Sequence, residues 1–174
     1  HKWDSTGPVT SLLKTNIIED SECIVSYGDI LFREKTIKKL INLESEISIA
    51  VDSVWKKRYS SRTIDDLISC EKVIISENEM ISAGSNIDPD KANAEFIGLL
   101  TFKPNVMKFL KNNSKLKKLD IKKANLSFLL MFLKKNGFSI KIIDVEGDWA
   151  EMNEAHDLAN FILGTKAQTL ARLE

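Results

Sequence analysis

The sequence contains only two cysteines, Cys23 and Cys70, among its 174 residues. Two cysteines form neither a disulfide framework nor a zinc site, so we expect reduced thiols in a cytoplasmic protein. Basic and acidic residues both total 25, and this zero net charge gives no support for a nucleic-acid or membrane partner. No apolar run approaches the roughly 18–20 residues that cross a bilayer. These absences leave a soluble globular protein whose length suits one domain with a real core.

Apolar residues occur either in short continuous runs, which predict buried strands, or at helical spacing. Continuous apolar strands that alternate with helices predict an α/β protein whose sheet is covered on both faces. Glu77 and Asn78 separate two of the strands, which predicts an antiparallel hairpin and therefore a mixed sheet. We expect strands at 22–27, 47–51, 71–76, 79–84, 95–102 and 138–145, helices at 7–16, 33–43, 103–112, 120–137 and from about 153, and a loop at 52–66.

Three acidic residues, Asp29, Asp52 and Glu151, follow predicted strands. In open α/β sheets, ligands bind beyond the carboxyl ends of the strands. Carboxylates gathered there suit Mg²⁺, which takes one or two of them together with substrate phosphate and several waters. Each of these acids could instead be a loop residue or a helix N-cap. The residues alone therefore predict an α/β domain with acids at the edge where ligands bind.

Three segments together resemble the nucleotidyltransferase family: VSYGDILF at 25–32, EFIGLLTF at 95–102 and DVEGDWAEMNEAHDLANFI at 144–162. Within that family the resemblance is closest to the cytidylyltransferases for phosphocholine and 2-aminoethylphosphonate, especially those joined to phosphoenolpyruvate mutase. It covers about residues 3–162. It implies a Rossmann-like, three-layer α/β/α fold with a mixed, mostly parallel sheet.

The implied reaction transfers a nucleotidyl group, with cytidylyl from CTP favoured, to a phosphorylated or phosphonate small molecule and releases pyrophosphate. The attacking oxygen is already anionic, so positioning and charge neutralisation suffice without a strong general base. This agrees with a chain that has only two histidines. Two alternatives stay open: a sugar-phosphate nucleotidyltransferase, and a degenerate, non-catalytic module that binds a nucleotide or a partner.

The resemblance also implies a Mg²⁺ site. Family members use an Asp after the first of these strands to hold Mg²⁺ against the triphosphate, and Asp29 matches it. In the closing acidic segment Glu151 matches, whereas Asn153 replaces the usual Asp. An asparagine keeps a carbonyl oxygen but removes a negative charge, so the metal ligands implied are Asp29, Glu151 and Asn153.

Residues near the acceptor are expected around the same edge. Cations for the acceptor's phosphate come from the basic cluster after the second strand, and a carboxylate meets an amine of the acceptor. Glycines let the backbone approach the substrate closely, and aromatic rings either frame a quaternary ammonium group or pack as a lid. The residues expected in these roles are Lys56, Lys57 and Arg58 as cations, Glu95 as the carboxylate, Gly28 and Gly98 as glycines, and Trp55 and Tyr59 as aromatic residues. Asp52, after the second strand, is also expected to bind substrate.

The family's Gly-rich loop, with its Arg and Lys, is not found in this sequence. The resemblance therefore implies that residues 1–162 are the C-terminal two-thirds of the catalytic domain, without its first strands. Residues 163–174 then begin a linker to a further domain. We expect an exposed sheet edge, and we expect that this piece alone does not turn over CTP whereas the intact protein does.

Overall fold

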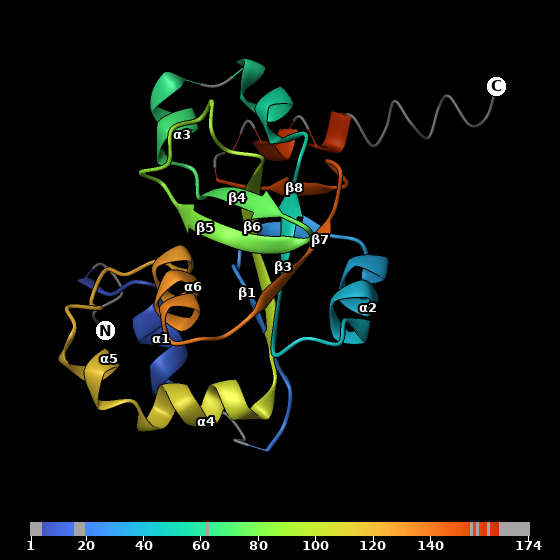
Figure 1. Ribbon diagram of the computed structural model, residues 1–174. Coiled ribbons are helices and arrows are strands. Elements are labelled where there is room, and N and C mark those ends of the chain that lie inside the picture. The colour runs from blue at the N-terminus through green and yellow to red at the C-terminus, as the bar shows by residue number, and fades with distance from the viewer. Residues whose placement is uncertain are drawn as a thin grey trace.

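The computed structural model describes residues 5–15, 20–61, 63–153, 155, 157–159 and 161–163. Its main sheet has six strands in the order β1-β6-β3-β7-β5-β4, and a small second sheet pairs β2 with β8 (Figure 1). The predicted linker lies, after its first residue, outside the described residues. The strands are β1 (Cys23–Ser26), β2 (Ile30–Phe32), β3 (Ile47–Asp52), β4 (Lys72–Ser76), β5 (Glu79–Gly84), β6 (Ala94–Phe102), β7 (Ile140–Asp144) and β8 (Trp149–Glu151).

The prediction of a mixed sheet is confirmed. β1, β3, β4 and β7 run in one direction, and β5 and β6 run in the other. Most strands of the main sheet thus point the same way, but most neighbouring strands are antiparallel. Among the described pairings of this sheet, β3–β7 alone is parallel. The reason is β6, which lies antiparallel between β1 and β3.

Helices cover both faces of the sheet, as the strand pattern predicts (Figure 1). Along β3, Ile47, Ile49 and Val51 face the larger core, while Ala50 faces the smaller one. Continuous burial of this strand follows from having a layer on each side. The larger core is closed by α1 (Pro8–Lys14), α4 (Pro104–Asn112), α5 (Ser114–Lys118) and α6 (Leu126–Lys135), and the smaller by α2 (Glu34–Asn42).

The prediction of a loop at 52–66 is wrong in part. This segment contains the 3₁₀-helix η2 (Trp55–Ser61) and the start of α3 (Ile64–Ser69). Thr63 and Asp66 form a capping box, in which each side chain bonds the other residue's backbone N–H. This Thr-x-x-Asp spacing was a usable helix-start signal.

The predicted hairpin is confirmed, and one predicted helix starts later than expected. The hairpin at β4–β5 forms, and its turn residues Glu77 and Asn78 have φ of 50° and 62°, as a type I′ turn requires. The helix expected at 120–137 begins only at Leu126, because the side chain of Asn125 caps the N–H of Phe128.

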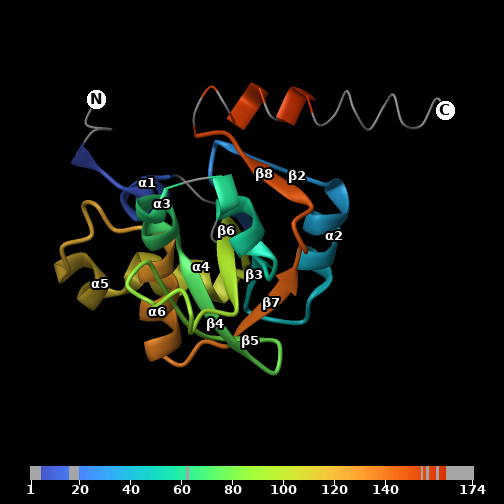
Figure 2. The same ribbon diagram turned by 90° about the horizontal axis from the view of Figure 1, so that it is seen from above.

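The small sheet and the sheet edges frame the site. Figure 2 shows β2 and β8 side by side next to α2. β1 forms one edge of the six-stranded sheet, where it pairs with β6 alone among the described strands. Ile24 in β1 is 44% exposed, as expected of an exposed edge. None of the described helices has the length and apolarity needed to cross a bilayer.

Candidate functional site

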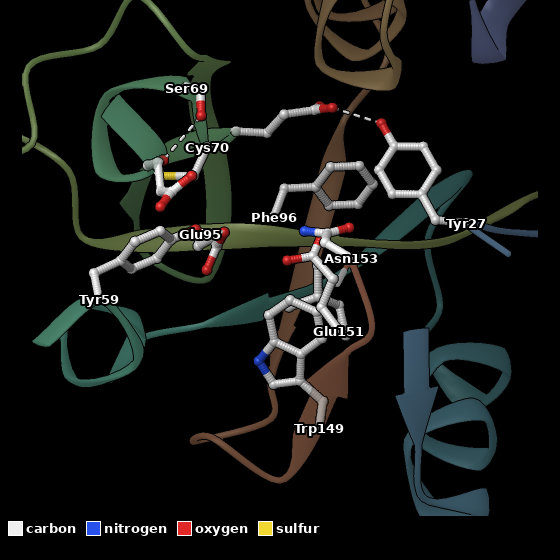
Figure 3. A pocket seen from close by; sticks show the side chains of 12 residues that line it. Tyr27, Tyr59, Ser69, Cys70, Glu95, Phe96, Trp149, Glu151 and Asn153 are labelled. Carbon is white, nitrogen blue, oxygen red and sulfur yellow. Dashed lines mark hydrogen bonds between the residues drawn. The ribbon is translucent and has the colours of Figure 1, made fainter. Parts of the chain in front are cut away.

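A cavity of about 200 Å³ lies where residues following β1 and β3 meet the starts of β4 and β6 (Figure 3). This is the carboxyl-end side of β1 and β3, where the strand pattern predicts ligand binding. No lysine or arginine is among the described residues that line it. The lining includes four carboxylates, Asp66, Glu71, Glu95 and Glu151, and four aromatic residues, Tyr27, Tyr59, Phe96 and Trp149.

Arg58 bridges two of these carboxylates. Its Nη1 lies 3.2 Å from Oε2 of Glu95, and its Nη2 lies 3.1 Å from Oε2 of Glu151. The Tyr59 hydroxyl donates to Oε1 of Glu95 at 2.6 Å. Glu95 is 4% exposed, and this burial raises the pKa of its carboxyl, although Arg58 and Tyr59 act in the opposite direction. The structure therefore brings the predicted residues Arg58, Glu95 and Glu151 together as one ion network.

Trp149 contacts both this network and the buried Asp52. The Cζ atom of Arg58 lies 3.9 Å from the centroid of the Trp149 ring, which is a cation–π contact. The indole Nε1 donates to Oδ2 of Asp52 at 2.9 Å, and the backbone N–H of Val54 donates to Oδ1 at 3.0 Å. Asp52 has no exposed surface. The structure places this residue, which the sequence assigns to substrate binding, behind the site, where it holds Trp149.

The other end of the cavity is built around Glu71, which sequence reasoning missed. The Tyr27 hydroxyl donates to Oε1 at 2.5 Å, and the backbone N–H of Ser127 donates to Oε2 at 2.9 Å. The Ser127 hydroxyl donates to the same Oε2. Ser127 lies in the first turn of α6, where the helix dipole favours a negative charge. Burial and the adjacent carboxylate both raise the pKa of the Tyr27 phenol, so Tyr27 stays a neutral donor.

The two segments that carry the predicted metal ligands lie side by side. The backbone N–H of Met152 donates to the carbonyl oxygen of Asp29 at 2.8 Å, and Ile30 pairs with Glu151 across β2–β8. Glu151 and Asn153 line the cavity. The described residues contain no group of three or more His, Cys, Asp or Glu side chains able to hold a metal. Carboxylate and amide oxygens from these segments nevertheless fit Mg²⁺, which needs few protein ligands when phosphate oxygens complete its shell.

Other predicted residues lie away from the cavity lining. Nζ of Lys56 lies 3.3 Å from Oδ1 of Asp90, in an exposed pair. Trp55 is 1% exposed and packs edge-on against Tyr59, with ring centroids 5.9 Å apart, so it supports the loop rather than framing a ligand. A Cβ built on Gly28 meets nothing within 4 Å, so space for close approach exists there.

Gly98 accommodates a side chain of the protein itself. A Cβ built on this residue would lie 2.6 Å from Cγ of Tyr27, and its φ is +82°. The sequence predicted close approach to the backbone at this glycine, and the approaching group in the structure is the Tyr27 ring. The signal for Tyr27 was its position directly before Gly28 and Asp29 in the quoted segment.

The chemistry available at this site is binding and charge placement. Cys70 lines the cavity, but burial raises the pKa of its thiol to about 11, which keeps it protonated at neutral pH. The described lining contains no histidine. An arrangement of carboxylates, aromatic rings and one bridging arginine suits the positioning of a charged substrate that brings its own nucleophile.

No family model matches the chain. It is 28% identical over 173 residues to the CTP:phosphoglutamine cytidylyltransferase of Campylobacter jejuni subsp. jejuni serotype O:2 (strain ATCC 700819 / NCTC 11168), a match that covers 90% of this chain and 68% of that protein.

Solved structures share the fold. The inositol-1-phosphate CTP transferase of T. maritima superposes with a TM-score of 0.66 at 21% identity, covering 88% of this chain and 58% of that one. A Bacillus anthracis structure assigned as a glucose-1-phosphate thymidylyltransferase has a TM-score of 0.64 at 15% identity, covering 90% and 59%. The chain thus spans less than two thirds of the length of these structures. It has their fold, a mixed sheet between helical layers.

Proposed function

From this cytidylyltransferase-like sequence and nucleotidyltransferase fold, we propose that the protein transfers a cytidylyl group from CTP to a phosphorylated small molecule and releases pyrophosphate. The observation that carries the proposal is the junction of Asp29 with residues 151–153, two of which line the cavity. An oxygen of the acceptor's phosphate attacks the α-phosphorus of CTP, and pyrophosphate leaves. The two free cysteines agree with a cytoplasmic location.

Mg²⁺ belongs to this proposal. Asp29 and Asn153 would hold it through a carboxylate and an amide oxygen, and when bound it supplies neutralisation of the triphosphate charge. Glu151 is the less available ligand, because one of its oxygens already pairs with Arg58. Its role is then to hold Arg58 at the cavity.

The acceptor proposed is one that carries a cationic group, as phosphocholine and 2-aminoethylphosphonate do. Four carboxylates line the cavity, and Arg58 compensates two of them. Glu71 is bound only by neutral donors among the described residues, so its charge is left for a ligand. The rings of Tyr27 and Tyr59 add faces that attract cations.

The test is a substrate screen on the full-length protein, with pyrophosphate release as readout. CTP, UTP and dTTP are each combined with phosphocholine, 2-aminoethylphosphonate and glucose-1-phosphate. We expect turnover with CTP and a cationic acceptor. Fastest turnover with glucose-1-phosphate would establish a sugar-phosphate enzyme, and nucleotide binding without turnover would establish a non-catalytic module.

Asp29→Asn tests the metal-binding residue directly. We expect turnover to be lost, with the thermal midpoint unchanged, because Asp29 is exposed. Asp20→Asn is the matched control, since it removes an exposed carboxylate paired with Lys108 on the surface. Retained activity in Asp29→Asn would remove this residue from the metal site.

A further inference from the structure

We propose that Tyr27 is a positioning residue. Its ring, seated on Gly98, fixes the Gly28–Asp29 turn against β8 and so sets where the Asp29 side chain stands. The inference rests on the proposed function only for the ligand role of Asp29. The placement of the turn follows from contacts on both sides of it.

The first contact is a tyrosine packed over a glycine in the neighbouring strand. The backbone N–H of Tyr27 donates to the carbonyl oxygen of Gly98 at 2.9 Å, which continues the β1–β6 pairing by one residue. The ring fills the place where a Gly98 side chain would be. An aromatic residue opposite a glycine covers backbone that would otherwise be exposed in a sheet, and it pins the strand register.

Gly98 also lies in an irregular part of β6. The β3–β6 register shifts between the pairs Ile49–Leu100 and Val51–Phe96, so β6 bulges around Gly98. Bulges re-aim side chains near functional sites. With φ of +82°, the position suits glycine on conformational grounds as well as steric ones.

The second contact holds the far end of the ring. The Tyr27 hydroxyl is bonded to Glu71, and Glu71 is bonded to the backbone N–H of Ser127 at the start of α6. The ring therefore cannot withdraw from this place without breaking a link to a helix in the larger core. Its position is set by β6 at one end and by α6 at the other.

The third contact lies on the other side of the turn. The carbonyl oxygen of Asp29 accepts the N–H of Met152, which fixes this residue to the segment that carries Asn153. Only Gly28 separates Asp29 from Tyr27, and Gly28 has open space beside it. With one residue between them, the backbone position of Tyr27 limits where Asp29 can stand.

The experiment displaces the ring and watches the turn. Gly98→Ala puts a methyl group into the ring, whereas the matched control Gly137→Ala strains a similar φ of +91° with nothing within 4 Å of the new Cβ. In the ¹⁵N-labelled full-length protein, we expect the amide resonances of Asp29 and Met152 to move in Gly98→Ala but not in Gly137→Ala. Tyr27→Phe keeps the ring over Gly98 but removes its bond to Glu71, so both resonances should move less than they do in Gly98→Ala.

Metal binding provides the functional readout. We expect Gly98→Ala to raise the dissociation constant for Mn²⁺, measured by electron paramagnetic resonance with CTP present, by about tenfold. We expect kcat to fall by about 100-fold, with the KM for CTP changed less, because misplacement by about 1 Å suffices for such a loss. In a Tyr27→Ala background, Gly98→Ala should add little to either loss.

Each outcome decides the inference. If Gly98→Ala loses thermal stability but keeps wild-type resonances at Asp29 and wild-type Mn²⁺ binding, Tyr27 is merely structural. If the wild-type protein shows neither Mn²⁺–CTP binding nor turnover, the proposed function fails, while the resonance shifts still test the placement of the turn. Should Gly98→Ala not fold, Tyr27→Leu removes the ring without strain at Gly98 and is judged by the same resonances.

Discussion

Glu95, at one end of the cavity, is bound by the guanidinium of Arg58, whereas Glu71, at the other end, is bound by a phenol, an amide and a hydroxyl. Figure 3 shows the two ends, with Tyr59 and Glu95 on one side and Tyr27 on the other. The first end is an ion network in which each charge depends on the others. The second is held by neutral donors and a helix N-terminus, so it keeps a negative charge that no described cation offsets. The first end should therefore govern stability, and the second should govern which ligand charge is accepted.

Removing the central cation should have the largest effect. Arg58→Ala leaves Glu95 and Glu151 without their shared partner, and the Arg58 side chain is only 18% exposed. Losing one member of a buried ion pair costs about 3 kcal/mol or more in the free energy of unfolding. Urea denaturation measures the change. Lys56→Ala is the control, because its pair with Asp90 is exposed and should contribute less than about 1 kcal/mol. Equal effects of the two variants would mean that Arg58 is no better paired than a surface residue.

Trp149→Phe should have a smaller effect at the same end. A phenylalanine keeps a ring for Arg58 but loses the indole N–H that donates to the buried Asp52. Because Val54 still donates to Asp52, we expect a loss of about 1–2 kcal/mol in the free energy of unfolding. An Asp52→Asn/Trp149→Phe double-mutant cycle separates the contact from the ring. Additive losses would contradict a direct bond between the two side chains.

The sequence predicted much of the first end and little of the second. Arg58, Glu95 and Glu151 were each assigned to the site, because an acid or a basic cluster at a strand end is a visible signal. Their mutual pairing was not predictable, since it depends on the β3–β6 register that sets Asp52 opposite Glu95 and on the turn of η2.

Glu71 and Tyr27 carried no comparable signal. Each is the end residue of a predicted strand, and the strand pattern alone explains such residues. What gives Glu71 its place is α6, whose first turn lies 56 residues further along the chain. Long-range contacts of this kind are decided by packing between elements, whereas the elements themselves follow from local apolar spacing. The Asp29–Met152 contact is the exception, since the resemblance had already joined the two segments.

Glu71→Gln tests the charge at the second end. A glutamine keeps one oxygen for the Tyr27 hydroxyl but removes the negative charge, so the KM for a cationic acceptor should rise by about tenfold, the equivalent of roughly 1.4 kcal/mol. The KM for CTP should stay within about twofold. Loss of the carboxylate at the α6 N-terminus should also lower stability by about 1 kcal/mol. An unchanged acceptor KM would show that the charge of Glu71 is not used for recognition.

The smallest effect concerns the pH dependence that burial gives Glu95. Because burial raises the pKa of Glu95 in the folded protein, the folded state holds this proton to a higher pH than the unfolded chain does, so Glu95 lowers stability as pH rises above the usual glutamate pKa of about 4.3. Glu95→Gln lacks this effect, and the stability of the wild type relative to the variant should therefore fall as pH rises above about 4.3. Urea denaturation of both proteins from about pH 4 upward measures this slope. The variant also loses the ion pair with Arg58, but where Glu95 is ionised in both the folded and the unfolded wild type, this loss changes the stability difference by a constant amount. A relative stability that instead rises with pH would mean that Arg58 and Tyr59 outweigh desolvation. Glu95 would then be a firmly ionised residue whose charge is offset by Arg58, and the contrast with Glu71 at the other end of the cavity would stand.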